Sequence, residues 1–214
     1  MARKMTDPIK QRDGSYVIVL DKAIVTPEEL KRMAEAMEEF NISLVKFTES
    51  QRIVIVGIDP ERVNEFCEKA GVKVAPATGK GVRSVKFCPG KVLCTMGLQD
   101  TIAMAERLIK FEGMELPDKL KIAVSGCPNS CTEPAVRDIG LMGKKDGFTL
   151  YVGGSAGREP RIGRVLAENL SMDEAEKLVE KILKFYKENA KKGQRLGKFI
   201  EEIGWDEFEV SILG

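Results

Sequence analysis

Two pairs of cysteines are spaced for metal or redox chemistry. Cys88 and Cys94 lie in the stretch FCPGKVLC, and Cys127 and Cys131 enclose a Pro-Asn-Ser turn in SGCPNSC. The chain has 214 residues and no histidine, which excludes a Cys/His zinc site, a Ser-His-Asp triad and a His-ligated haem. A metal group bound here must therefore take sulfur or oxygen ligands.

Four thiolates at these spacings favour a [4Fe–4S] cluster. Such a cluster needs a dry pocket and backbone N–H groups near its sulfurs, and each cysteine pair stands where a strand is expected to end in a turn. A structural zinc site with four thiolates is one alternative, but both pairs lack its usual C-x2-C spacing, and unrelated thiols are another. The cysteine run of ordinary ferredoxins is absent. Cys67, on the apolar face of an expected helix, is predicted to be a buried core thiol.

The elements before residue 79 predict a small α/β unit. We expect strands over 15–20, 43–47 and 52–58, and helices over 26–40 and 59–71. The first helix should begin with a capping box formed by Thr26 and Glu29. The order strand, helix, strand, strand, helix indicates a sheet with helices on one face. The Gly/Pro-rich stretch APATGKG predicts a boundary, with one domain at 1–78 and a second at 79–214.

The second domain is predicted to place the cysteine pairs at the ends of strands. We expect strands over 82–87, 119–125 and 148–154, of which the first two run into Cys88 and Cys127. Amphipathic helices are expected over 98–111 and 171–192, the second with a capping box of Ser171 and Glu174, followed by further C-terminal helices. The charged run AKKGQRLGK at 190–198 is interpreted as a solvated helix end. The predicted fold class is α/β (α+β).

The composition excludes several classes of function. Hydrophobic residues make up 43% and charged residues 31%, as in ordinary globular proteins. A net charge of +1 provides no global field for nucleic acid or an anionic membrane, and no stretch is long and apolar enough to span a bilayer. The chain shows no secretory signal pattern, so we expect a cytoplasmic protein. It also has no P-loop or dinucleotide fingerprint, so redox chemistry here would need an external electron donor.

Taken together, the motifs resemble those of the siroheme/[4Fe–4S] sulfite and nitrite reductase family. The C-x5-C pair followed by GCPNSC resembles the family's cluster signature, and LPDKLKIAVSGCPNSC resembles the lysine-bearing strand joined to it. FTESQRIVIVGI resembles a strand of the ferredoxin-like half domain, and LYVGG followed by arginines resembles the loop that binds siroheme carboxylates. Full-length members contain two such halves. This chain is similar to one half, as in the low-molecular-weight, assimilatory-type sulfite reductases of anaerobes and archaea.

The resemblance implies a ferredoxin-like half domain followed by an α/β domain that binds siroheme and a [4Fe–4S] cluster. Cys88, Cys94, Cys127 and Cys131 would ligate the cluster, and Cys131 would also be the axial ligand of the siroheme iron. Siroheme carries many carboxylates, so its pocket needs cations and close backbone amides. The predicted cofactor-binding residues are Cys131, Arg158, Arg161, Arg164, Gly153, Gly154, Asn129 and Gln51, with Lys80 and Lys91 as weaker candidates.

The resemblance also implies a group of cations over the substrate, because sulfite is a dianion whose reduction consumes protons. Lys119 and Lys121 match the family's lysine pair and, two residues apart on a strand, share one face. Arg83 matches one of the family's two arginines. Where the family carries the other arginine this chain has Ser50, and Arg52, two residues on, is the candidate replacement.

The implied function is reduction of sulfite to sulfide, or of nitrite to ammonia, with electrons from an external one-electron donor such as a ferredoxin. A non-catalytic siroheme/[4Fe–4S] carrier or sensor is one alternative, which the serine at position 50 favours, and a zinc protein without a redox role is another. In two-half members the cluster cysteines come from one half and the substrate cations largely from the other. We therefore expect a homodimer with two composite sites, the alternative being a monomer whose own loops fold over the haem.

Overall fold

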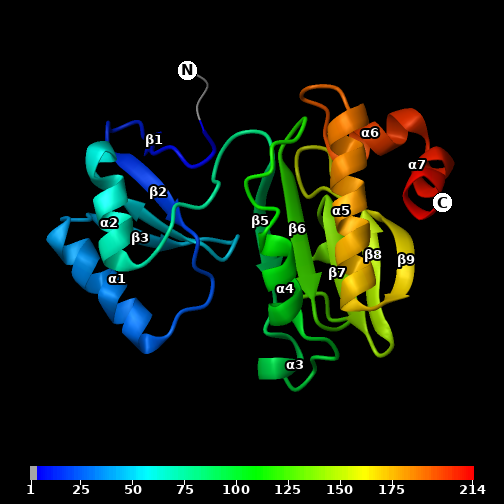
Figure 1. Ribbon diagram of the computed structural model, residues 1–214, viewed down its shortest axis with the longest axis horizontal. Coiled ribbons are helices and arrows are strands. Elements are labelled where there is room, and N and C mark those ends of the chain that lie inside the picture. The colour runs from blue at the N-terminus through cyan, green and yellow to red at the C-terminus, as the bar shows by residue number, and fades with distance from the viewer. Residues whose placement is uncertain (1–3) are drawn as a thin grey trace. The chain divides into compact units, whose positions relative to one another are not determined.

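The computed structural model describes residues 4–214, which form two compact units that divide between Gly79 and Lys80 (Figure 1). Both units combine helices with a sheet, which confirms the predicted mixed α/β class. Among residues 4–214, none of the helices combines the length and the apolar character that a bilayer span requires.

The first unit is a four-stranded antiparallel sheet with two helices on one face (Figure 1). Its strands lie in the order β1-β2-β4-β3. The buried side chains of the sheet and the two helices form one apolar core, in which Ile18 and Ile55 pack with Met33 and Phe66. The elements are β1 (Ile9–Lys10), β2 (Tyr16–Leu20), α1 (Pro27–Glu39), β3 (Leu44–Phe47), β4 (Ile53–Val56), a 3-10 turn (Pro60–Arg62) and α2 (Val63–Ala70).

The helix ends of this unit follow the predicted capping rules. Thr26 Oγ1 accepts the N–H of Glu29 at 3.2 Å, and the Glu29 carboxylate accepts the N–H of Thr26 at 2.9 Å, so the capping box is confirmed. Helix α2 ends at Gly71, whose φ of 70° suits a residue without a side chain. Cys67 packs against this core, as predicted, but it is half-buried rather than buried, and burial raises the pKa of its thiol.

The second unit is built on a five-stranded sheet in the order β5-β6-β7-β8-β9. The first three strands are parallel, β8 runs antiparallel to β7, and β9 pairs antiparallel with β8 and so runs in the direction of the first three. Strands β7 and β9 were not predicted. Gly140 and Gly143 lower the intrinsic strand propensity of β7. The strand forms because it pairs with β6 on one side and β8 on the other. The strands are β5 (Val82–Phe87), β6 (Leu120–Ser125), β7 (Ile139–Lys144), β8 (Gly147–Val152) and β9 (Arg164–Leu170).

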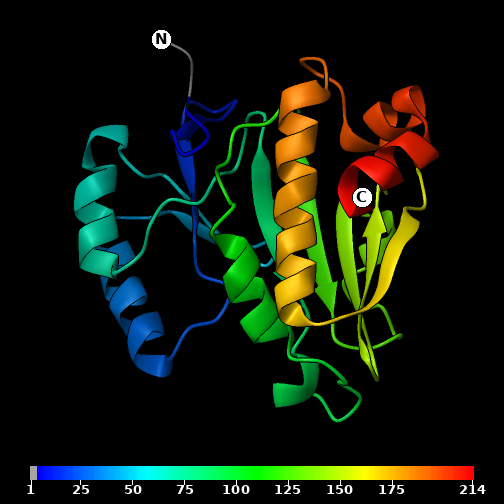
Figure 2. The same ribbon diagram turned by 45° about the vertical axis from the view of Figure 1, so that its right-hand side comes forward.

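Helices cover one face of this sheet. Figures 1 and 2 show α4 and α5 side by side in front of the strands, with α6 near the C-terminal end of α5 and α7 beside it. The core between them and the sheet contains Met104 and Val179 from the helices and Ile122, Leu141 and Leu150 from the strands. The helices are α3 (Gly90–Leu93), α4 (Thr101–Ile109), α5 (Met172–Asn189), α6 (Leu196–Ile203) and α7 (Trp205–Leu213).

Chain without regular structure covers the opposite face of the sheet. Ile139 and Leu141 belong to the helix-covered core, so Gly140 between them faces the other way. A Cβ at Gly140 would lie 2.0 Å from the carbonyl oxygen of Pro134, which belongs to a short 3-10 turn, Pro134–Val136. The segment between β6 and β7 therefore returns across this second face in direct backbone contact with it.

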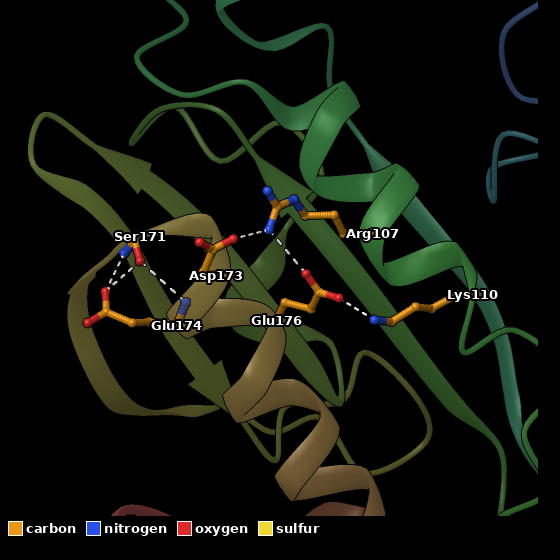
Figure 3. Close-up of polar contacts among 6 residues, drawn as sticks. All are labelled: Arg107, Lys110, Ser171, Asp173, Glu174 and Glu176. Atoms are coloured by element: carbon orange, nitrogen blue, oxygen red, sulfur yellow. Dashed lines mark hydrogen bonds and ion pairs between the residues drawn. The ribbon is translucent and has the colours of Figure 1, made fainter.

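Two cations, one in the last turn of α4 and one just after it, reach carboxylates on α5 (Figure 3). Arg107 contacts Asp173 and also Glu176, the latter at 3.1 Å, and Lys110 contacts Glu176 as well. In the same turn the hydroxyl of Ser171 caps α5 by accepting the N–H of Glu174 at 3.3 Å, as the sequence predicted. This network joins the two helices that cover the core.

Replacing Glu176 with Gln should remove the carboxylate that these two cations share. We expect the free energy of unfolding to fall by about 0.5–1 kcal/mol near neutral pH. The hydrogen bond from Lys110 lowers the pKa of Glu176 below its ordinary value of 4.5. A carboxylate of this kind stabilises the fold above its unfolded pKa and loses that contribution as pH falls through the folded pKa. Urea unfolding should therefore show the difference from wild type shrinking below about pH 4.

Glu180→Gln is a control, because it removes only a pair within α5, between Glu180 and Lys184. Its cost should be smaller, because this pair is exposed to solvent and screened by it. Equal costs for the two variants would mean that the contacts between α4 and α5 add nothing.

Candidate functional site

The two cysteine pairs meet at one edge of the larger sheet. Cys88 follows β5 directly, and Cys127 comes after β6 and Gly126. Because β5 and β6 are parallel, with Phe87 opposite Val124, their carboxyl ends lie together. Both thiols are buried, at 8% exposure, and the N–H of Gly126 donates to Cys88 Sγ at 3.1 Å. This edge therefore offers sulfur ligands and a backbone donor in a largely dry setting.

The loops that carry the cysteines touch through their backbones. The N–H groups of Leu98 and Gln99 both donate to the carbonyl oxygen of Gly126, at 2.8 and 3.0 Å. A Cβ at Gly126 would lie 2.9 Å from Gly90 Cα, and one at Gly97 would lie 2.3 Å from the carbonyl carbon of Gly90. Glycine is needed at these positions because no side chain fits between the loops.

Cys94 is half-buried and Cys131 is exposed. Ser130, whose φ is 57°, closes a turn by donating its N–H to the carbonyl of Cys127 at 3.2 Å, just before Cys131. Within residues 4–214, no three cysteine or carboxylate side chains are grouped around a single ion position. A [4Fe–4S] cluster binds each thiolate to a different iron, and the all-thiolate donor set on two touching loops fits that group. The assignment of all four thiols to one cluster remains a prediction.

After Cys131 the chain is held to β6 and then crosses the second face of the sheet. Ser125 Oγ accepts the N–H of Thr132 at 3.1 Å and hydrogen-bonds its hydroxyl at 2.7 Å. Glu133 follows in a left-handed conformation, with φ of 55°, and contacts Arg137 at 2.6 Å and Lys86 at 3.7 Å. These contacts carry the chain from the cysteine edge towards the beginning of β7.

A cationic cavity lies at the beginning of β6 and β7. Its volume is about 120 Å³. Lys119, predicted to lie on β6, instead comes just before it, but it lines this cavity together with Lys121 as expected. The full lining is Lys119, Lys121, Val136, Arg137, Asp138, Ser155, Ala156, Gly157 and Arg195, which gives four cations and one carboxylate. Such a set suits a small, multiply charged anion.

The carboxylate, Asp138, is buried and fully engaged. It accepts three hydrogen bonds from Arg195, from Nε at 3.2 Å and from Nη2 at 2.6 and 2.8 Å, and a fourth from the N–H of Lys121 at 2.9 Å. Burial raises the pKa of Asp138, while the charge and hydrogen bonds of Arg195 oppose the rise. The negative charge of Asp138 is therefore compensated by Arg195, and it is not available to repel an anion in the cavity.

Arg83, a predicted substrate cation, lies half-buried on β5. Burial lowers its pKa, the carboxylate of Asp118 opposes that, and the positive charge of Arg195 lowers it further. Arg83 and Arg195 are thus close enough for their charges to interact.

Two other predicted residues belong to the first unit. Arg52 is buried, and its guanidinium donates to the carbonyl oxygen of Asp21 at 3.1 Å. Gln51 lies in a turn with φ of 58°, its N–H donating to the carbonyl of Thr48 at 3.0 Å. The role of either residue in a site remains a prediction.

The predicted cofactor arginines follow the glycine-rich loop after β8. Arg158 is exposed, Arg161 contacts Glu201 at 2.7 Å, and the guanidinium of Arg164 lies 4.2 Å from the centre of the Trp205 ring. Gly154 packs against the chain after Cys131, since a Cβ there would lie 2.6 Å from the carbonyl oxygens of Ala135 and Arg137. The remaining predicted positions are Gly153, with φ of 86°, and Asn129, exposed in the cysteine turn.

The sequence prediction missed Arg137, Asp138 and Arg195. The run at 190–198 was interpreted as a solvated helix end, which is wrong for Arg195, whose side chain is 24% exposed and bound to Asp138. No local pattern marks Arg195, because its partner is 57 positions away in the chain. Arg137 and Asp138 come soon after the second cysteine pair, and this proximity was the one feature of the sequence that could have marked them as site residues.

Comparison with known proteins gives consistent matches. Residues 78–212 match the family model described as the nitrite and sulphite reductase 4Fe-4S domain, and residues 9–70 match that of the nitrite/sulfite reductase ferredoxin-like half domain. An assimilatory-type sulfite reductase of Nitratidesulfovibrio vulgaris is 38% identical over 210 residues, which is 96% of each chain. An NAD(P)H nitrite reductase of Bacillus subtilis is 34% identical over 91% of this chain, which spans only 24% of that protein.

A crystal structure of dissimilatory sulfite reductase I has the same fold. It superposes with a TM-score of 0.83 at 15% identity, over 92% of this chain and 69% of that one.

Proposed function

The chain belongs to the nitrite and sulfite reductase family, as the cysteine motifs predicted, and from that premise we propose that it reduces sulfite to sulfide. The proposed cofactors are siroheme and a [4Fe–4S] cluster, with electrons from an external one-electron donor such as a ferredoxin. The observation that carries the proposal is the cavity in which Lys119 and Lys121 meet two arginines. We propose sulfite rather than nitrite as the substrate because the match to the assimilatory-type sulfite reductase covers 96% of that protein.

The proposed cofactor ligands come from two edges of the sheet, the cysteines from the carboxyl ends of β5 and β6 and the glycine-rich loop from the end of β8. Cys88, Cys94, Cys127 and Cys131 would hold the cluster, and Cys131, the exposed thiol, would also hold siroheme. Gly153, Gly154, Arg158, Arg161 and Arg164 would face its carboxylates, with Asn129 and Gln51 as further contacts. When bound, the two groups supply electrons to the substrate.

The residues of the chain supply charge and protons. A sulfite dianion needs several cations around it, and the cavity offers two lysines and two arginines, with Arg83 close to Arg195. Arginine does not release its proton, so the arginines bind the oxygens, whereas each lysine ammonium is able to donate a proton. We assign proton delivery to Lys119 and Lys121 on this ground. Arg52 is the less favoured substrate cation, because its guanidinium is buried against Asp21.

A non-catalytic siroheme/[4Fe–4S] carrier or sensor is the second candidate. It is favoured by the turn before β4, where Ser50 stands in place of the family arginine and its hydroxyl hydrogen-bonds Thr48 at 3.0 Å. Anaerobically purified protein, assayed with sulfite and a reduced dye, separates the two functions. Sulfide production supports the reductase, whereas a coloured protein that produces none supports the carrier.

Cys131→Ser should abolish the siroheme absorption and lower the iron content, because it removes the proposed bridging sulfur. Cys67→Ser should keep both, since Cys67 lies on a helix of the first unit. Visible spectra, iron analysis and acid-labile sulfide analysis of the two purified variants make the comparison. Equal losses in both would refute the assignment of Cys131.

Lys121→Met should leave the visible spectrum and the iron content unchanged while sulfite turnover falls by roughly 10²-fold or more. That is the usual cost of removing one preorganised charge donor. Lys187→Met, at an exposed position of α5, is the control and should keep wild-type turnover. Unchanged turnover in Lys121→Met would place Lys121 outside the substrate site.

The separation along β6 supports a composite site. Lys121 lies near the beginning of the strand and the cysteine turn follows its end, so the two lie roughly 13 Å or more apart at about 3.3 Å per residue. In the proposed homodimer each subunit would lend Arg83, Lys119 and Lys121 to the siroheme of its partner.

Mixing two inactive variants tests this arrangement. In a mixed dimer of Cys131→Ser and Lys121→Met, the intact haem of the second subunit would face the intact Lys121 of the first, so we expect activity to reappear after subunit exchange. The other site would carry both lesions. Verified mixed dimers without activity, or an active protein that sediments as a monomer, would overturn the shared-site model.

A further inference from the structure

Arg195 enters the cationic cavity from the connection between α5 and α6. Its position is fixed by contacts on both sides. The N–H of Gly193 donates to the carbonyl oxygen of Pro117 at 2.8 Å, and the Tyr186 hydroxyl donates to the carbonyl oxygen of Gln194 at 2.5 Å. Leu196, which follows Arg195, is buried in the core of the unit. The guanidinium is therefore presented by a rigid segment.

Asp138 accepts hydrogen bonds from only two of the three nitrogens of the Arg195 guanidinium. The Nε and Nη2 groups of Arg195 donate to the carboxylate, whereas Nη1 donates to no acceptor within the described residues 4–214. The ammonium of Lys119, on the same cavity, likewise has no acceptor in the described part of the chain. Two directed donors thus remain for an anion, in addition to the charges of Lys121 and Arg137.

Asp138 also reaches the neighbouring strand. Its Oδ2 accepts both Arg195 Nη2, at 2.8 Å, and the backbone N–H of Lys121, at 2.9 Å. One buried carboxylate therefore fixes the orientation of the Arg195 guanidinium relative to the beginning of β6. An arginine oriented in this way loses little side-chain entropy when it binds a ligand.

We infer that Arg195 is an anion-binding residue of this cavity and that Asp138 is the positioning residue that orients it. The inference rests on the proposed function and extends it to a cation at the C-terminal side of the chain. A cavity of about 120 Å³ suits a small oxyanion group, since pockets for drug-sized ligands occupy roughly 300–1,000 Å³. The ligand is either sulfite itself or one carboxylate of siroheme, which share this chemistry.

The test uses the oxidised holoprotein and variants that separate orientation from charge. The double variant Asp138→Asn with Arg195→Gln removes one charge of each sign, so no unpaired charge stays buried and the net charge is unchanged. If the two residues act as proposed, its affinity for sulfite, measured by isothermal titration calorimetry, should fall at least about tenfold. Arg195→Lys keeps the positive charge but loses the planar set of guanidinium donors. Its affinity for sulfite should lie between those of the double variant and wild type.

Asp138→Asn alone separates positioning from simple electrostatics. It removes one negative charge from the cavity, so electrostatic attraction alone predicts tighter binding of sulfite. Positioning predicts weaker binding, because the guanidinium loses the acceptor that orients it. Lys198→Gln, at an exposed position of α6, is the matched control for loss of one cation and should bind sulfite like wild type.

Siroheme content, from visible absorption and iron analysis, distinguishes the two sources of the anion. Weaker sulfite binding at full siroheme content identifies sulfite as the ligand, and siroheme loss identifies a carboxylate of the cofactor. The inference is overturned if the double variant and Asp138→Asn both match wild type in sulfite affinity and in siroheme content. A wild-type protein that binds sulfite through Arg195 without reducing it would refute the proposed function and leave this inference standing.

Discussion

Strand β6 is hydrogen-bonded to a parallel neighbour on each side, and this pairing positions both chemically important groups of the larger unit. At the carboxyl ends of β5 and β6 the register brings Cys88 and Cys127 to one edge. At the amino ends of β6 and β7 it brings Lys121 beside Asp138. A slip of one residue would turn the side chains of β6 to the opposite faces and bury Lys121 in the apolar core. The register is therefore the constraint on which the cysteine edge and the cationic cavity both depend.

The cationic cavity exists because a buried carboxylate offsets part of its charge. Cations brought close together in a half-buried setting repel one another. Burial lowers the pKa of Arg83, the carboxylate of Asp118 opposes that, and the charge of Arg195 lowers the pKa further. Asp138 holds Arg195 with three hydrogen bonds, and Glu133 holds Arg137 at 2.6 Å. These carboxylates orient the arginines, so that an arriving anion meets donors already in place.

Backbone contact is the second structural requirement of the site. The two cysteine loops meet at Gly90 and Gly126, the first loop closes on itself at Gly97, and the chain after Cys131 crosses the sheet at Gly140. Each contact is too close for a side chain, so its geometry depends on the main chain. Loops joined in this way hold sulfur ligands more firmly than contacts between flexible side chains would.

The sequence by itself determined the features that local chemistry controls. The capping boxes at Thr26 and Ser171 and the strands that run into Cys88 and Cys127 all follow from short-range patterns. Family membership also follows from them, because the cysteine spacing is specific. Strands β7 and β9 and the residues Asp138 and Arg195 were decided only by the tertiary structure. Glycines lower the strand propensity of β7, and Asp138, which binds Arg195, comes 57 residues earlier in the chain, so neither feature is visible in any short stretch of sequence.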